Sequence, residues 1–175
     1  MIRSIGRRLA VGSTALALGG LGAIVAQSPA FAADFSAAYT CTAPVLGTQS
    51  VTIAGTLTAS PNPAAVGTSV GFALHLAQIS LQAPVAINSW TMTVILEVSG
   101  AQTAQFPVTG SGRRVPANQP ITGDLSGSWT PTAAGNDEVR GAAVTVNANV
   151  FLLGNITVDC TPNDPRPVGE TLTVS

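Results

Sequence analysis

Apolar and polar residues alternate with a period of two along most of the chain after residue 33. The clearest case is 87–99, where Trp90, Met92 and Val94 share one phase with the apolar residues that follow. This alternation is typical of a β-strand with one buried face. It predicts about nine strands, at 35–45, 48–58, 68–77, 87–99, 105–108, 121–129, 139–153, 155–160 and 168–174.

Turn-forming residues separate these segments, and no stretch shows the period of an amphipathic helix. Prolines end the second segment at Ser60-Pro61-Asn62-Pro63, and Pro162, Pro165 and Pro167 precede the last one. The pattern predicts an all-β chain of mostly antiparallel strands packed face to face. An immunoglobulin-like or Greek-key β-sandwich is the expected architecture, and a closed barrel is the alternative.

The first 32 residues have the organisation of a secretion signal. A positively charged start (1–8) leads into an apolar stretch (9–25), and Ala30-Phe31-Ala32 provides a cleavage motif. We therefore expect cleavage before Ala33 and a single domain over 33–175, located outside the cell and associated with the cell wall. Arg7-Arg8 leaves a twin-arginine route open beside general secretion.

The two cysteines fit an oxidising compartment. Cys41 lies near the start of the predicted domain and Cys160 near its end. A lone pair of cysteines in a secreted domain predicts one disulfide, which would tie the first strand to a late one.

Charge narrows the set of partners. Residues 33–175 contain four arginines, no lysine and eight acidic residues, which gives a formal charge of −4. This balance argues against nucleic acid as a partner. It also argues against attraction to an anionic membrane, so no membrane partner is expected after signal cleavage.

Residues with catalytic potential lack the context that catalysis needs. Gly67-Thr68-Ser69-Val70-Gly71 matches the serine-hydrolase pattern, but a strand follows it, and the lone histidine, His75, lies inside that strand. His75 has the phase opposite to the apolar residues of the strand, so it is expected to face solvent or a polar face of the sheet. The chain is therefore expected not to be an enzyme, and no catalytic residue, metal or cofactor is assigned. The alternative is a small extracellular hydrolase that uses loop carboxylates, with Glu97 paired with Asp124 or Glu138.

Three residues are candidates for ligand binding. Trp129 has small neighbours that would leave its ring accessible to a sugar. Arg113 and Arg114 follow Gly110-Ser111-Gly112, a stretch read as a loop whose backbone amides would hold an anion together with the two side chains. The competing interpretations are a buried tryptophan and solvated arginines at a hairpin tip.

Two stretches resemble known proteins. Residues 60–70, Ser60-Pro61-Asn62-Pro63 through Val70, resemble the turn and strand of bacterial immunoglobulin-like repeats. Tyr39-Thr40-Cys41-Thr42, Leu46-Gly47-Thr48-Gln49 and Ile156 to Pro162 are similar to small secreted actinobacterial domains of unknown function. The first resemblance implies a spacer or adhesion unit, and the second carries no activity with it.

These observations predict a non-catalytic protein with a binding or structural role at the cell envelope, whose partner is a cell-wall polymer or an extracellular protein. A second alternative is an assembly subunit that completes a neighbour's sheet with a free edge strand.

Overall fold

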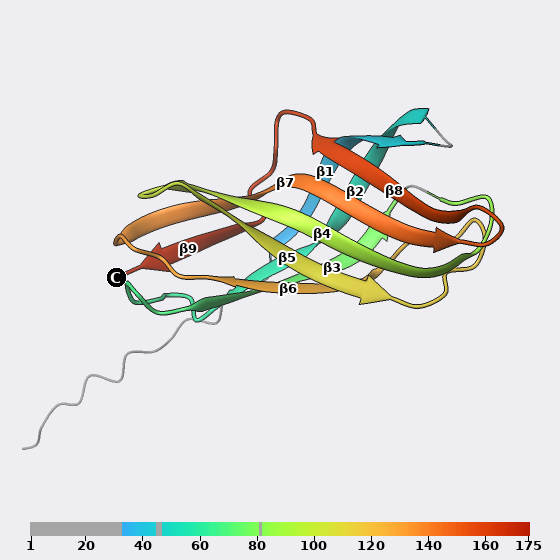
Figure 1. Ribbon diagram of the computed structural model, residues 1–175. Helices are drawn as coiled ribbons and strands as arrows, with labels where there is room; N and C mark the ends of the chain where they lie inside the picture. Colours follow the sequence, from blue (N-terminus) through green and yellow to red (C-terminus); the bar gives the residue numbers. More distant parts are fainter. Residues whose placement is uncertain (1–32, 45–46, 81) are drawn as a thin grey trace, which may run out of the picture.

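The computed structural model describes residues 33–44, 47–80 and 82–175 (Figure 1). The predicted signal and its cleavage motif lie outside the described residues. The described part forms nine strands and no helix: β1 (Ala33–Ala43), β2 (Gly47–Ser60), β3 (Val70–Ile79), β4 (Ile87–Gly100), β5 (Ala104–Gly112), β6 (Gly123–Trp129), β7 (Gly135–Val150), β8 (Gly154–Pro162) and β9 (Glu170–Val174). The prediction of an all-β chain is confirmed.

Eight of the strands close into a ring. Around the ring the order is β4, β5, β6, β3, β2, β1, β8, β7 and back to β4, and every neighbouring pair is antiparallel. The ninth strand, β9, pairs with the first residues of β7. All strands thus belong to one continuous sheet, so the predicted immunoglobulin-like strand order is not confirmed. The strands pair instead in a closed ring, as the alternative prediction has it.

The alternation seen in the sequence places apolar side chains inside the ring. Along β4, Trp90, Met92, Val94, Leu96 and Val98 are buried, while the residues between them are more exposed. Because successive side chains of a strand point to opposite faces, each strand contributes one apolar row to a shared core. Full burial of a valine, leucine or phenylalanine side chain contributes about 1.5–3 kcal/mol, so these rows supply the main driving force for folding.

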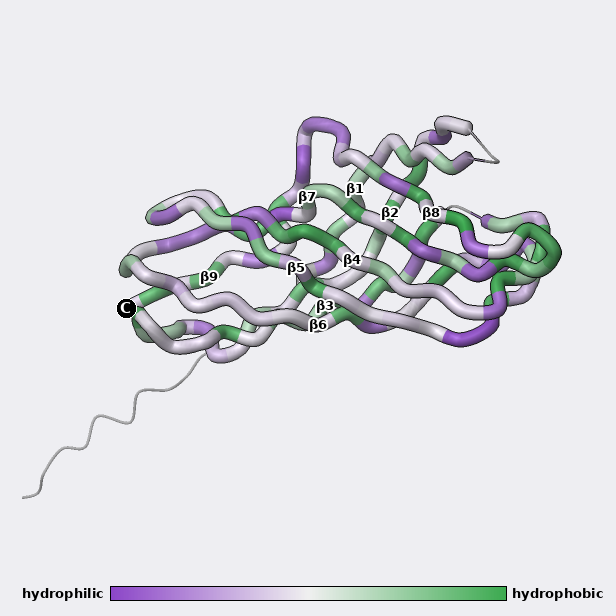
Figure 2. The backbone as a smooth tube through the Cα atoms, in the orientation of Figure 1, coloured by the Kyte–Doolittle hydropathy of each residue, from purple (hydrophilic) through white to green (hydrophobic). Residues whose placement is uncertain are grey.

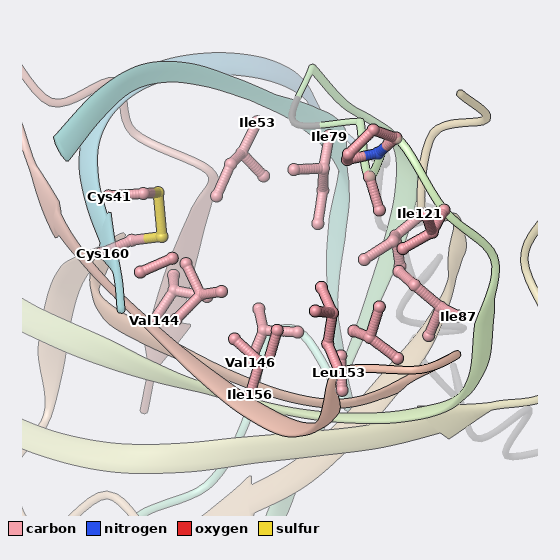
Figure 3. Close-up of a pocket in the computed structure, with 17 residues that line it drawn as sticks. Cys41, Ile53, Ile79, Ile87, Ile121, Val144, Val146, Leu153, Ile156 and Cys160 are labelled. Atoms are coloured by element: carbon pink, nitrogen blue, oxygen red, sulfur yellow. A yellow bond between two sulfur atoms is a disulfide. The ribbon is translucent and has the colours of Figure 1, made fainter. Parts of the chain in front are cut away.

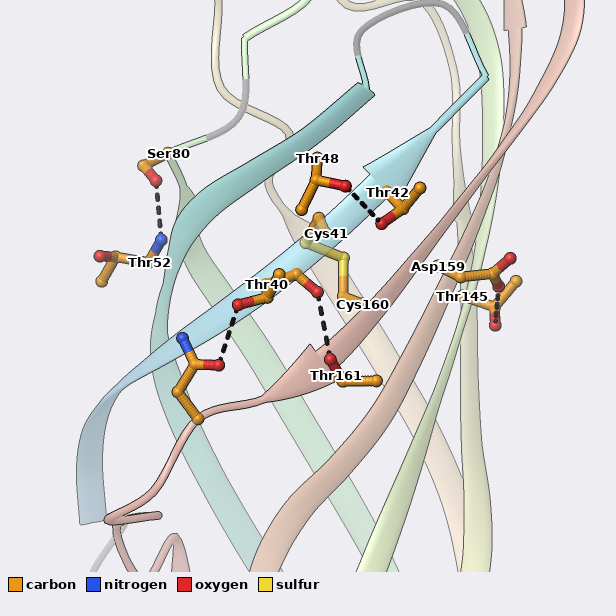
Figure 4. Close-up of a disulfide and its surroundings, with 11 residues drawn as sticks. Thr40, Cys41, Thr42, Thr48, Thr52, Ser80, Thr145, Asp159, Cys160 and Thr161 are labelled. Carbon is orange, nitrogen blue, oxygen red and sulfur yellow. Dashed lines mark hydrogen bonds between the residues drawn. A yellow bond between two sulfur atoms is a disulfide. The ribbon is translucent and has the colours of Figure 1, made fainter.

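The ring has two short contacts. β5 and β6 share one register pair, Thr109 opposite Ser126, and the second short contact is the seam between β1 and β8. β1 pairs with β2 over its whole length, but with β8 only from Tyr39 opposite Pro162 to Thr42 opposite Asp159. Cys41 lies directly opposite Cys160 in this seam, and the two form the predicted disulfide (Figure 4).

Polar side chains reinforce the seam on its outer face. The Thr40 hydroxyl donates a hydrogen bond to the Asn163 side-chain oxygen at 3.0 Å, and the backbone amide of Asn163 donates to the Ala38 carbonyl at 2.9 Å. The Thr161 hydroxyl on β8 donates to the Thr40 carbonyl on β1 at 3.4 Å, which also crosses the seam (Figure 4). The covalent and polar contacts thus compensate for the small number of ladder pairs.

The structure corrects two boundaries. Gly110-Ser111-Gly112 was expected to be a loop, but it is the end of β5 and pairs with Trp90 to Met92. A β-carbon at Gly112 would lie 2.4 Å from the Trp90 indole, so the glycine is there because the ring packs against the backbone. The main chain of Gly110-Ser111-Gly112 pairs with β4, so this segment is not the loop on which the candidate backbone anion site was based.

The second correction concerns the end of β7. The expected strand 139–153 ends at Val150, and residues 151–153 form a turn into β8. Leu152 continues the apolar phase of β7 and was expected to face inward. It lies instead in the left-handed region, at a φ of 67°, and is 85% exposed.

We expect the disulfide to contribute strongly to stability. Replacing both cysteines by alanine should lower the free energy of unfolding by about 4 kcal/mol, because the unfolded chain regains the freedom of a long closed loop. Equilibrium urea unfolding measures this change, and the native protein in excess reductant should match the double variant. Equal urea midpoints for the oxidised native protein and the variant would contradict the expectation.

Candidate functional site

A cavity of about 100 Å³ lies inside one end of the ring, beside the disulfide (Figure 3). Its wall is formed by strands β1, β2, β3, β4, β7 and β8 together with the connections from β3 to β4, from β5 to β6 (Ile121) and from β7 to β8 (Leu153). The 17 lining residues are all aliphatic, proline or the bonded cysteines: Cys41, Ala43, Ile53, Ile79, Ala83, Pro84, Val85, Ile87, Ile121, Val144, Val146, Ala148, Val150, Leu153, Ile156, Val158 and Cys160.

This lining determines which ligands the cavity accepts. None of its side chains offers a conventional hydrogen-bond donor or acceptor, so a polar group that entered would lose its bonds to water without replacement. Apolar cavities of comparable size, roughly 150 Å³, stay dry and bind benzene-sized molecules. The cavity is therefore suited to an apolar group, such as the end of an acyl chain.

Two of the lining residues, Pro84 and Leu153, are also exposed at the surface, and the part of the cavity wall that they form is called here the mouth. Pro84 is exposed, and Leu153 is 51% exposed. Leu153 belongs to the turn Phe151-Leu152-Leu153, called here the apolar turn. The amide of Phe151 donates to the Ala86 carbonyl at 2.9 Å, which holds the turn against the connection from β3 to β4.

The structure places the predicted ligand-binding residues at opposite ends of the molecule. Arg113 and Arg114 are exposed and precede Val115, whose backbone exchanges two 2.9 Å hydrogen bonds with Ile87 of the cavity wall. The two arginines thus lie at the end that carries the mouth. Trp129 pairs with Val70 at the far end of β6.

Trp129 is only partly accessible. Its ring is half-buried and stacks on Phe106, with the ring centres 5.9 Å apart and the planes at 6°. One face of the indole is therefore covered by protein. A role of Trp129, Arg113 or Arg114 in ligand binding stays a prediction.

The carboxylates considered for hydrolysis are paired with cations. Glu97 accepts a hydrogen bond from Arg166 at 2.7 Å, and Glu138 forms an ion pair with Arg140. The Arg166 guanidinium lowers the pKa of Glu97 by hydrogen bonding and by its charge. A general acid needs a raised pKa, so this shift has the wrong direction for that role.

The remaining candidates are surface features. His75 is exposed, as its phase predicted, and its Nδ1 lies 2.7 Å from Asp124 across the β3–β6 pair. Ser69 precedes β3, so a strand and not a helix follows the hydrolase-like motif. Among the described residues, no three histidine, cysteine or acidic side chains gather as a metal site, and no helix is long and apolar enough to cross a membrane.

Comparisons with known proteins do not identify a family for this chain. The sequence matches no protein-family model and no curated protein. Its fold is similar, at 14% identity and a TM-score of 0.45, to a solved structure described as "Putative membrane anchored protein from Corynebacterium diphtheriae". The match covers 82% of this chain and 38% of that protein. A likeness at this level carries no information about function.

Two carboxylates are buried elsewhere in the described part, and they differ in how well they are satisfied. Asp137 accepts hydrogen bonds from the backbone and side chain of Gln102 at 3.1 and 3.0 Å. One oxygen of Glu170 accepts from the Thr171 amide, while the other has no partner. Burial raises the pKa of Glu170, because the charged form loses its hydration.

We expect Glu170→Gln to raise the melting temperature at pH 7. At that pH the unfolded chain carries a charged Glu170, whereas the native site favours the neutral form, and the amide removes the free-energy cost of this difference. Below the ordinary glutamate pKa of 4.5 the group is neutral in folded and unfolded chains alike, so the difference should vanish. Calorimetry at both pH values tests this, with the exposed Asp34→Asn as the control; a difference independent of pH would contradict it.

Proposed function

We propose that this chain is a non-catalytic binding protein of the extracellular cell envelope that takes the apolar end of an envelope lipid into its cavity. The observation that carries the proposal is the cavity itself, which combines an all-aliphatic lining with a mouth at the surface. Protein interiors are close-packed, so a hollow is an exception, and ligand-binding sites are concave and lined mostly by apolar side chains.

The compartment fits this role. The disulfide between Cys41 and Cys160 is compatible with an extracellular location, where such bonds persist. The predicted signal would deliver the protein to the envelope, where acyl chains are abundant.

The other candidate functions find less support. A hydrolase would need an accessible carboxylate with a raised pKa. Glu97 and Glu138 hold arginines, Asp124 holds His75, and the carboxylate whose pKa is raised, Glu170, is buried.

An assembly subunit would need a long free strand edge. Each of β1 to β8 has a neighbour on both sides, so the unpaired edge is divided between the first residues of β1, which precede its pairing with β8, and β5 and β6, which share one register pair. The outer edge of β9 is bridged at Val174 by Ala64. Wall binding through Trp129 would have to use the ring face that Phe106 leaves open.

The size of the cavity limits its affinity. Each buried methylene contributes about 0.8 kcal/mol, so a chain end of about five carbons gains roughly 4 kcal/mol. This corresponds to a dissociation constant of about 1 mM. The cavity alone would therefore bind weakly, and a lipid would need a second contact outside it.

Octanoate tests the proposal, because it carries a chain end of the right kind and stays monomeric at millimolar concentration. Titrating it into residues 33–175, which contain every strand, should shift the methyl resonances of Ile53, Val146 and Val158 saturably, with a dissociation constant near 1 mM. The methyl resonance of Met92, which is buried and does not line this cavity, should not move.

Ala148→Leu is the decisive variant, since it adds bulk to the cavity wall and should weaken octanoate binding at least tenfold. Ala143→Leu is the matched control on the outer face of the same strand and should bind as the native protein does. Absence of shifts in the native protein, or equal binding by the two variants, would overturn the proposal.

A further inference from the structure

The large apolar side chains exposed at the surface are concentrated in one place. In the described part these are Phe151, Leu152 and Leu153, at 54%, 85% and 51% exposure, and Val66 at 45%. Val66 lies alone beside the C-terminus, where its amide bonds the Ser175 carbonyl. Single exposed apolar residues are ordinary, whereas three consecutive ones mark an interaction site.

The apolar turn is held outward by its backbone. Hydrogen bonds from Phe151 to Ala86 and from Leu153 to Val150 fix its two sides. Leu152 between them has a φ of 67°, a conformation that favours glycine or asparagine. A leucine at this position is unfavourable for the fold and also exposed, which points to a use outside the fold. Figure 2 shows the turn as a hydrophobic tip at the end of the molecule opposite the C-terminus.

Positive charge accompanies this tip. Arg113 and Arg114 form no ion pair, whereas Arg140 and Arg166 are bound to Glu138 and Glu97. The hydrogen bonds between Val115 and Ile87 bring the two arginines to the end that holds the apolar turn. The segments 82–88, 113–122 and 147–157 at this end contain no acidic residue. The nearest acid on β6, Asp124, is hydrogen-bonded to His75.

We propose that this end of the molecule docks on an anionic lipid surface, with the apolar turn inserted among the acyl chains and Arg113 and Arg114 against the headgroup phosphates. A short apolar element beside unpaired cations is the arrangement by which proteins bind such interfaces. A second copy of the chain fits less well, because a two-fold pair through this end would assemble both arginine pairs without an acid from these segments to neutralise them.

Docking would supply the second contact that a lipid bound weakly by the cavity needs. This part of the proposal rests on the proposed function. The mouth at Leu153 would face the bilayer, so a lipid chain could enter without crossing water. The expectation from the formal charge of −4 was that no membrane would be bound. The proposal departs from it because the segments that compose this end contain no acidic residue, and the adjacent Asp124 is hydrogen-bonded to His75.

Vesicle sedimentation tests the docking. Residues 33–175 should sediment with vesicles of phosphatidylglycerol and phosphatidylcholine, and at least tenfold more weakly with phosphatidylcholine alone. Leu152→Asp should reduce binding to the mixed vesicles at least tenfold. Val66→Asp is the matched control, an equal charge at an exposed apolar residue of the opposite end, and should bind as the native protein does. Arg113→Gln with Arg114→Gln should abolish the preference for phosphatidylglycerol.

Each outcome is decisive. Failure of the native protein to sediment, or equal binding by Leu152→Asp and Val66→Asp, would overturn the docking. So would a dimer in lipid-free solution that Leu152→Asp dissociates, since the turn would then serve a second copy. Ala148→Leu separates this proposal from the proposed function. It should still bind vesicles, while Leu152→Asp should still bind octanoate.

Discussion

Closure of the sheet between β1 and β8 is the constraint on which the rest of the structure depends. The first and eighth strands meet over only four register pairs, and the bond between Cys41 and Cys160 joins them at the centre of this contact. Without the seam, β1 and β8 would each expose an unpaired edge, and the ring would lose its interior. The same disulfide forms part of the cavity wall, so the element that closes the fold also borders the candidate site.

The two ends of the ring differ in character. At the end with the C-terminus, Phe106 packs between Phe72 and Trp129, with ring centres 4.7 and 5.9 Å away, and aromatic rings fill the interior. At the opposite end small and branched side chains surround the disulfide and leave a hollow. Aliphatic side chains from six strands and three connections leave this space unfilled, and the hollow lies at the end where the apolar turn, Arg113 and Arg114 gather.

Sequence periodicity predicted the strands well because alternation reports directly which face of a strand is buried. It placed Trp90 in the core and His75 outside, and the positions of the two cysteines indicated their bond. Periodicity does not show which strands pair with one another, so the ring and its cavity could not be derived from it. The glycines of β5 look like a loop until the Trp90 ring that covers Gly112 is known. Leu152 looks like a buried strand residue, because an apolar run continues through a turn without any change in hydrophobicity.

The net charge of the domain is likewise an incomplete guide to the surfaces that it can bind. A formal charge of −4 describes the molecule at distances beyond the Debye length, about 8 Å at physiological ionic strength, where individual groups are no longer distinguished. A docked surface lies within that distance of the groups it touches. The segments that compose the proposed docking end contain Arg113 and Arg114 but no acidic residue. Glu97 and Glu138 lie toward the other end of β4 and β7, where they pair with Arg166 and Arg140. An acidic protein can therefore present a cationic, apolar end, and the strand pairing decides which residues compose it.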